Sequence, residues 1–431
     1  MRSIMLLLVA GCAQPVSERE GRILDTLAED NYAWALRDPA LVALKLRKMQ
    51  RGPYEWLRGT AALYWRDVME PGGDRGVTAF GDARSARVLL VGDPHPENAG
   101  TFRASDGTMF VDWNDFDATG YGPYEGDLRR LATGFSIIAP EHADELVRII
   151  ATSYAAQIAE LATGARVGAI GLGVSPLFDK ELDKARTRGD AGFAIDEFAP
   201  LTNGVRALAL GDLEPVAADG VLEDRVVAVT AEEADWIARA LPGRSIELAA
   251  RRIGPGVSSY PAYRFDVVLA GDRIIELKET RDGVIIHGVP QLEGSEWATP
   301  AERSIDTQRR LHARPDGDAL LAAAQVGGLS LKIRDREAYQ RGIDAEDLAE
   351  LPADELRDIA RLYGALLARA HGQALTADRV LGYTVIAPLL AGREVAFADE
   401  LAAFAAGDTG QVIADHALMR DRDLGAAIGA P

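Results

Sequence analysis

The chain has 431 residues, which is too long for one small hydrophobic core, so we expect two lobes or domains. Hydrophobic residues make up 48% of it and charged residues 26%, which is typical of a soluble globular protein. The formal net charge of −19 argues against a nucleic-acid partner, because such a partner requires a basic face. Since Cys12 is the only cysteine, an intrachain disulfide bond is excluded.

The N-terminus has the pattern of a bacterial lipoprotein signal. One arginine precedes an apolar run that ends in Leu8-Val-Ala-Gly-Cys12. The run is too short to cross a bilayer as a helix, but it resembles a signal that is cleaved before Cys12, whose thiol is then acylated. We therefore predict a signal and tether over residues 1–19 and a membrane-anchored lipoprotein of the cell envelope. The alternative is an ordinary apolar N-terminus on a cytoplasmic protein.

Helices and short strands are expected in the first half of the chain. Apolar residues at helical spacing predict a helix over residues 20–50 and a buried helix over residues 54–70. A short buried strand over residues 87–92 leads into the loop that contains Asp93. A hairpin and two helices are expected next, over residues 101–116, 126–138 and 141–162.

The second half begins without a clear motif and then becomes rich in strands. A tight turn at Gly271-Asp272 is expected to join two alternating strands into a hairpin over residues 263–278. A further strand is expected over residues 329–333. The remainder is predicted to be helical, with a strongly amphipathic helix over residues 354–372 and a helix over residues 395–424.

Acidic side chains are concentrated in the loop after the first predicted strand and in the hairpin that follows it. Asp93 and Asn98 lie five residues apart, and three carboxylates come downstream at Asp112, Asp115 and Asp117. Such a cluster needs cations or protons to neutralise it. Hard oxygen ligands suit Mg²⁺, and Mg²⁺ held by few carboxylates usually shares its coordination shell with phosphates. The cluster therefore predicts a site for phosphoryl transfer.

A second set of residues is suited to phosphate binding. Gly254-Pro-Gly256 precedes the predicted hairpin, and a Gly-rich turn before a strand lets backbone amides approach phosphates. Lys278 lies on the second strand of that hairpin. Each signal is weak alone, because Gly-Pro-Gly is more often an ordinary turn and a strand lysine is more often solvated. Pro255 also removes one amide donor.

Two other kinds of site are excluded. No second histidine lies at a ligand spacing from His95, so a zinc site is rejected. The chain has no Gly-x-Ser-x-Gly motif, which excludes a serine nucleophile of that type. His371 is expected to be a packed or hydrogen-bonded structural residue.

These motifs resemble the bacterial family called domain of unknown function 2252. They resemble more distantly the kinase-like superfamily that contains the aminoglycoside and choline phosphotransferases. The resemblance to the bacterial family runs from about residue 45 to the end of the chain. The matching motifs are Pro53-Tyr-Glu-Trp-Leu-Arg-Gly, Gly92-Asp-Pro-His-Pro-Glu-Asn, Phe110-Val-Asp-Trp-Asn-Asp-Phe-Asp, Gly122-Pro-Tyr-Glu-Gly-Asp-Leu-Arg-Arg-Leu-Ala, Ile275-Glu-Leu-Lys-Glu, Leu331-Lys-Ile-Arg-Asp and Leu366-Leu-Ala-Arg-Ala-His.

The resemblance implies an α+β, two-lobed, protein-kinase-like fold of the aminoglycoside-phosphotransferase type. In that superfamily the Gly-rich strands and the lysine precede the catalytic loop. Here the loop with Asp93 comes first, so the fold is expected to be circularly permuted. The implied parts are a helical lobe with the catalytic loop and metal carboxylates (20–250), a nucleotide-clamping β lobe (251–345) and C-terminal helices that complete the helical lobe (346–431).

The resemblance also implies a role for each matching residue. Asp93 would be the general base or would orient the acceptor hydroxyl, and Asn98 would bind a metal ion. Asp115 is the preferred second metal ligand, and Asp112 is kept as a further carboxylate. Asp127 would brace the catalytic loop. Lys278, Gly254 and Gly256 would bind the phosphates. Glu302 is one candidate for the residue that pairs with Lys278.

Together these roles imply ATP and Mg²⁺ as cofactors of a phosphotransferase that acts on an unknown hydroxyl of a small molecule or protein. A lipid-anchored protein beyond the inner membrane would meet little ATP, so alternatives stay open. The chain could be a catalytically inactive kinase-like binding or scaffold lipoprotein, or it could use another phosphorylated donor. A further alternative is nucleotidyl transfer on the same fold, in which AMP is moved.

Overall fold

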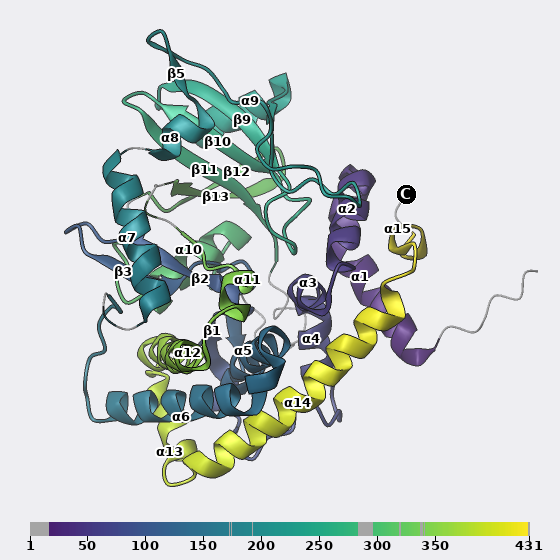
Figure 1. Cartoon of the computed structure of the whole chain (residues 1–431), viewed down its shortest axis with the longest axis vertical. Coiled ribbons are helices and arrows are strands. Elements are labelled where there is room, and N and C mark those ends of the chain that lie inside the picture. Colours follow the sequence, from purple (N-terminus) through teal and green to yellow (C-terminus); the bar gives the residue numbers. More distant parts are fainter. Residues whose placement is uncertain are drawn as a thin grey trace, which may run out of the picture.

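The computed structural model describes residues 17–171, 173, 175–191, 193–282, 296–318, 320–336, 339 and 341–429. Cys12 and most of the predicted signal lie outside these residues. No helix within them is long and apolar enough to cross a membrane. The fold is mixed α+β, as expected, with a sheet at one end of the molecule and packed helices at the other (Figure 1).

The N-terminal segment forms four helices where the sequence predicted two. Their bounds are Glu18–Arg37 for α1, Pro39–Met49 for α2, Pro53–Gly59 for α3 and Ala61–Val68 for α4. The predicted helix over residues 20–50 breaks at Asp38, whose side chain accepts a hydrogen bond from the Leu41 amide and caps α2. Pro39 stands at the first position of α2, where its missing N–H costs nothing.

Two small antiparallel pairs follow the N-terminal helices. The bounds are Ser85–Arg87 for η1, Val88–Leu90 for β1, Pro96–Asn98 for η2, Ala99–Arg103 for β2, Met109–Trp113 for β3 and Gly120–Gly122 for β4. β1 pairs with β4, and β2 pairs with β3. The predicted hairpin is confirmed, and its turn includes Gly107 at a φ of 86°. β1 is fully buried, as expected of a short apolar strand.

The helical end of the molecule is built around one hydrophobic core. Its elements are α5 Tyr124–Ile138, η3 Pro140–His142, α6 Ala143–Ala162, α12 Ala353–Gln373, α13 Tyr383–Leu390, α14 Glu394–Met419 and α15 Leu424–Ala427. α12 packs along α6, and the long α14 packs against both α5 and α6 (Figure 1). The predicted helices over residues 126–138, 141–162 and 354–372 are therefore confirmed. The buried side chains include Leu128, Tyr154 and Tyr363.

The sheet has seven antiparallel strands in the order β12-β13-β11-β10-β9-β8-β7. The bounds are Gly211–Asp212 for β7, Arg225–Ala228 for β8, Ile246–Ile253 for β9, Arg264–Leu269 for β10, Arg273–Thr280 for β11, Ala322–Val326 for β12 and Leu329–Asp335 for β13. The predicted hairpin and the predicted strand over residues 329–333 are confirmed as β10, β11 and β13. Apolar side chains on one sheet face pack against α9 (Ala231–Ala240) through Trp236 and Ile237.

The predicted boundary at residue 250 is wrong. β7 and β8 lie before it, and the boundary would cut through β9, so the sheet begins well upstream. Residues 165–250 also contribute elements whose bounds are Pro176–Ala191 for α7, Phe193–Phe198 for α8, Leu201–Thr202 for β5 and Val205–Arg206 for β6. The remaining short helices are Pro300–Leu311 for α10 and Ala345–Ala349 for α11.

Candidate active site

The loop after β1 is held by a buried carboxylate at the start of α5. Asp127 accepts hydrogen bonds from the backbone amides of Val91 at 2.8 Å and Gly92 at 3.1 Å. His371 of α12 contacts the same carboxylate through Nε2 at 3.0 Å, and its Nδ1 lies 2.9 Å from the Tyr154 hydroxyl. The predicted bracing role of Asp127 and the predicted structural role of His371 are confirmed by these contacts.

Gly92 lets the loop pass very close to another part of the backbone. Its φ is 93°, and a Cβ added at this position would lie 2.0 Å from the Ala118 carbonyl oxygen. A larger residue therefore cannot occupy the position without moving the chain. Trp65 Nε1 donates a 2.6 Å hydrogen bond to the Gly92 carbonyl. These contacts set the direction in which the chain leaves toward Asp93.

Asp93 lines a cleft and is paired with a buried arginine. Arg130 of α5 donates from Nε to Asp93 Oδ1 at 2.8 Å, and its side chain is only 1% exposed. Burial raises the pKa of Asp93, although Arg130 works in the opposite direction. A carboxylate with a raised pKa is suited to accept a proton from a hydroxyl group.

Asn98 is oriented by the same loop. Its Nδ2 donates to the Asp93 carbonyl oxygen at 2.8 Å, which leaves Oδ1 as the atom that can bind a cation. The Asn98 carbonyl accepts a 3.0 Å hydrogen bond from the Asn114 amide and so joins the loop to the end of β3. His95 is buried beside them, and burial together with the Arg58 and Arg130 cations lowers its pKa well below the usual value. It is therefore neutral at physiological pH.

Lys278 of β11 meets the carboxylates that follow β3. Its Nζ lies 2.5 Å from Asp117 Oδ2 and 3.6 Å from Asp115 Oδ2. Burial alone would raise the pKa of Asp115, but Lys278 and the Asp117 amide outweigh burial and lower it. Burial alone would lower the pKa of Lys278, but the two carboxylates raise it. Both groups are therefore charged at neutral pH.

The metal-ligand role expected of Asp112 is wrong. The side chain is completely buried and forms a two-pronged ion pair with Arg369 of α12. Its oxygens also accept hydrogen bonds from the amides of Trp113 and Ala313, both at 2.9 Å. With these partners the carboxylate is neutralised and enclosed, so it is a structural group rather than a cation ligand.

Two residues that were expected to contact the phosphates or Lys278, Glu302 and Gly254, lie elsewhere in the structure. Glu302 is exposed at the start of α10, where it accepts a hydrogen bond from the Ala298 amide, and Lys278 pairs with the aspartates instead. Gly254 has a φ of 109° and packs against the Glu223 carbonyl, 2.6 Å from where a Cβ would stand. It serves the turn after β9. Gly256 does line the cleft.

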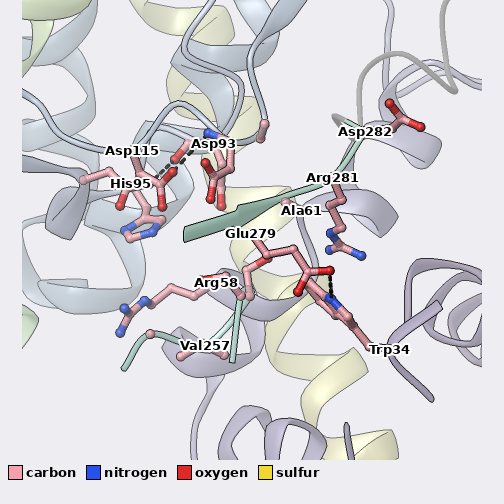
Figure 2. A pocket seen from close by; sticks show the side chains of 16 residues that line it. Trp34, Arg58, Ala61, Asp93, His95, Asp115, Val257, Glu279, Arg281 and Asp282 are labelled. Carbon is pink, nitrogen blue, oxygen red and sulfur yellow. Dashed lines mark hydrogen bonds between the residues drawn. The ribbon is translucent and has the colours of Figure 1, made fainter. Parts of the chain in front are cut away.

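The cleft between the sheet and the helices contains two adjoining cavities of about 100 Å³ and about 450 Å³. Both are lined by Asp115, Asp117, Gly256 and Ser259. The smaller cavity is also lined by Asp93, His95 and Asn98. Figure 2 shows Asp93, His95 and Asp115 gathered on one wall, with Glu279, Arg281 and Trp34 opposite. The larger cavity extends along the sheet past Lys278.

Residues 37–422 match the model of a bacterial family described as "Uncharacterized protein conserved in bacteria" (DUF2252). The chain belongs to this family. No curated protein and no solved structure matches it. The family description assigns no activity, so the chemistry of the DUF2252 chain has to be argued from the cleft itself.

The cleft residues fit a magnesium ion that is shared with phosphates. Among the described residues, no group of three or more His, Cys, Asp or Glu side chains could hold a metal ion unaided. Mg²⁺ rarely needs such a cage, because it usually binds one or two carboxylates together with waters and substrate phosphates. Asp115, Asp117 and the Asn98 amide oxygen provide that number of oxygen ligands.

Two important cleft residues escaped prediction, although the sequence held a signal for both. Arg130 follows Asp127 by three positions, and this helical spacing places both side chains toward the same loop. Lys332 lies between Leu331 and Ile333 on β13, so alternation points it away from the apolar face.

Proposed function

We propose that this chain is an ATP- and Mg²⁺-dependent phosphotransferase that acts on a hydroxyl acceptor. The observation that carries the proposal is the meeting of Lys278 from the sheet with Asp115 and Asp117 from the helical end. Asp93 and Asn98 line the same cleft. A lysine cation, a pair of carboxylates, an amide oxygen and a separate base are the parts that phosphoryl transfer requires.

The topology of the sheet supports the proposal. β9, β10 and β11 form a meander, α10 follows, and β12 and β13 complete that side of the sheet. Protein kinases carry their phosphate-binding lysine on the third strand of such a meander, beyond a Gly-rich loop. Lys278 lies on β11, and the loop with Gly256 joins β9 to β10. The catalytic loop comes earlier in the chain, in keeping with a circularly permuted kinase-like fold.

In the proposed reaction Asp93 accepts the proton of the acceptor hydroxyl. The acceptor oxygen bonds to the terminal phosphorus of the donor, and the bond between that phosphorus and the bridging oxygen breaks. Arg130 keeps the Asp93 carboxylate in one orientation through its 2.8 Å hydrogen bond. Lys278 balances negative charge on the donor phosphates, while Asn98, Asp115 and Asp117 would hold Mg²⁺. The metal ion, when bound, neutralises charge that develops on the phosphate oxygens.

Titration calorimetry on the full-length chain tests the proposal. We expect wild type to bind ATP only when Mg²⁺ is present. Asp115→Asn and Lys278→Met should each weaken binding by about tenfold or more, because each removes a charged contact. Lys180→Met is the matched control, since Lys180 is exposed on α7, away from the cleft lining. No Mg²⁺-dependent binding by wild type would contradict the proposal and favour an inactive binding protein.

We also propose that the chain is anchored to a membrane through acylated Cys12, on the strength of the Leu8-Val-Ala-Gly-Cys12 pattern. Because a protein anchored beyond the inner membrane would meet little ATP, the anchor and the phosphotransferase proposal hold together there only with another phosphorylated donor. Cys12→Ser is then expected to move the protein from the membrane fraction to the soluble fraction. Fractionation and intact-mass measurement would check this. A wild-type protein that is soluble and retains Met1 would contradict the anchor and leave the cytoplasmic alternative.

A further inference from the structure

The sheet face that looks into the cleft is ionic. Alternation along β10, β11 and β13 brings charged residues into direct register across the strands: Asp266 opposite Glu276, Glu276 opposite Arg334, Arg264 opposite Lys278, and Lys278 opposite Lys332. The opposite face of the same strands is apolar and packs on α9. Burying charges costs free energy unless they are paired or bind a ligand, so such a face calls for a functional explanation.

The larger cavity lies on this ionic face. Its volume of about 450 Å³ is within the usual range for small-molecule sites. Among the described residues that line it, seven are basic and four are acidic, although the whole chain carries a net charge of −19. The basic residues are Arg252, Arg264, Lys278, Lys332, Arg334, Arg336 and Arg341. Three of these cations are already paired with carboxylates outside the lining: Arg252 with Asp224, Arg336 with Asp266 and Arg341 with Glu181. The positive charge left for an anionic ligand comes from Lys332, which has no carboxylate partner among the described residues, and from Arg264 and Arg334, which share the single carboxylate of Glu276.

Several of these cations keep donors for a ligand. Glu276 is shared by two guanidinium groups, at 3.1 Å from Arg264 Nη1 and 2.7 Å from Arg334 Nε. In the part of the chain that the structure describes, the two Nη groups of Arg334 have no hydrogen-bond partner. Lys332 Nζ contacts Gln308 Oε1 at 2.7 Å and Ser304 Oγ at 3.3 Å, and neither group balances its charge. Paired N–H donors of this kind match phosphate oxygens.

The apolar part of the same sheet face is covered by the chain itself. Val268 and Ile274 continue the rows of Asp266 and Glu276, and they are buried under Ile195 and Phe198 of α8. Among the described residues that line the cavity, Phe102 is the one aromatic residue; it is 2% exposed and stacks on Phe110. The described lining thus presents no exposed aromatic or large apolar side chain on which a nucleobase could stack.

We propose that the larger cavity binds the phosphoryl donor as a linear chain of phosphates and provides no site for a nucleobase. The donor class is accordingly polyphosphate, either inorganic or as the triphosphate of a nucleotide whose base stays outside the cavity. This inference rests on the proposed phosphotransferase function and narrows its donor. Lys278 and the neighbouring aspartates mark the end at which the terminal phosphate meets the acceptor, and Arg334 lies further along the cavity.

The transfer step is balanced without any group beyond those named. The acceptor hydroxyl gives its proton to Asp93, and its oxygen bonds to the terminal phosphorus of the chain. The bond from that phosphorus to the bridging oxygen breaks, and the electron pair stays with the shortened chain. One phosphate is thereby moved and the donor leaves one unit shorter.

Calorimetry with tripolyphosphate, ATP and GTP on the full-length chain, each with Mg²⁺, tests the inference. Tripolyphosphate is expected to bind at least as tightly as ATP, and ATP and GTP should bind equally. Arg334→Gln should weaken all three by about tenfold or more. Arg239→Gln is the control, because Arg239 is an exposed residue of α9, on the other side of the sheet. The wild-type comparison does not depend on whether the cavity variant folds.

The outcomes separate this inference from the proposed function. ATP binding that is about tenfold tighter than both GTP and tripolyphosphate would overturn the inference, since the base would then be recognised. The phosphotransferase proposal would survive that result. If none of the three ligands binds with Mg²⁺, both proposals fail. Equal loss of affinity in Arg334→Gln and Arg239→Gln would also overturn the assignment of the donor to this cavity.

Discussion

Replacing Asp93 by Asn is expected to lower the rate of phosphoryl transfer by about 10²–10⁴-fold while donor binding changes little. The carboxylate lies in the cleft beside Asn98 and Asp115, and it is the proposed proton acceptor. Asparagine keeps the side-chain oxygen that Arg130 contacts, so the loop should retain its shape. Release of phosphate from ATP or tripolyphosphate, with water as the acceptor, provides a readout before the natural acceptor is known.

Asp106→Asn makes the same change in charge on the exposed β2–β3 turn and is the matched control. Its rate should equal that of wild type. As the pH is lowered, the wild-type rate should fall once Asp93 becomes protonated and can no longer act as the base. Because burial raises the pKa of Asp93, this fall should begin at a higher pH than it would for an ordinary aspartate. Equal rates for Asp93→Asn and Asp106→Asn would remove Asp93 from the reaction.

Replacing Asp112 by Asn is expected to lower the free energy of unfolding by about 3–5 kcal/mol. Arg369 is only 2% exposed, and this substitution leaves its charge buried without a counter-ion. Chemical denaturation of the purified variant measures the loss. The side chain reaches neither cleft cavity, so Mg²⁺-dependent donor binding by the folded variant should be unchanged.

Asp144→Asn is the control for this prediction, because Asp144 forms an exposed ion pair with Arg148 on α6 and should cost less than about 1 kcal/mol. Burial alone would raise the pKa of Asp112, but Arg369 and His312 outweigh it, so the folded-state pKa is below the unfolded value. The stabilisation is therefore complete above about pH 4 and is lost as the pH falls through the folded-state pKa. A folded variant that has lost only Mg²⁺-dependent binding would restore Asp112 as a metal ligand.

Local patterns along the chain were enough to predict most helices and strands. The amphipathic repeat of α12 and the alternation of β10 and β11 depend on neighbours within a few residues, and these are visible in the sequence. The break at Asp38 was missed, because capping and proline signals are weaker than a continuing apolar repeat. The break at Thr60 was also missed, and there neither a capping side chain nor a proline marks it. The short strands β7 and β8 were also missed, since they present little alternation and depend on β9 for their pairing.

The sequence by itself determined the family, the secondary structure and the presence of a loop that carries Asp93 and Asn98 ahead of an acidic hairpin. Only the tertiary structure decided how those acids are neutralised. Asp112 forms an ion pair with Arg369, which is 257 positions away in the sequence. Asp115 and Asp117 instead form ion pairs with Lys278 in the cleft. The electrostatic energy of a carboxylate depends on its burial and on the cations within a few ångströms, and neither quantity can be read from the spacing of residues along the chain.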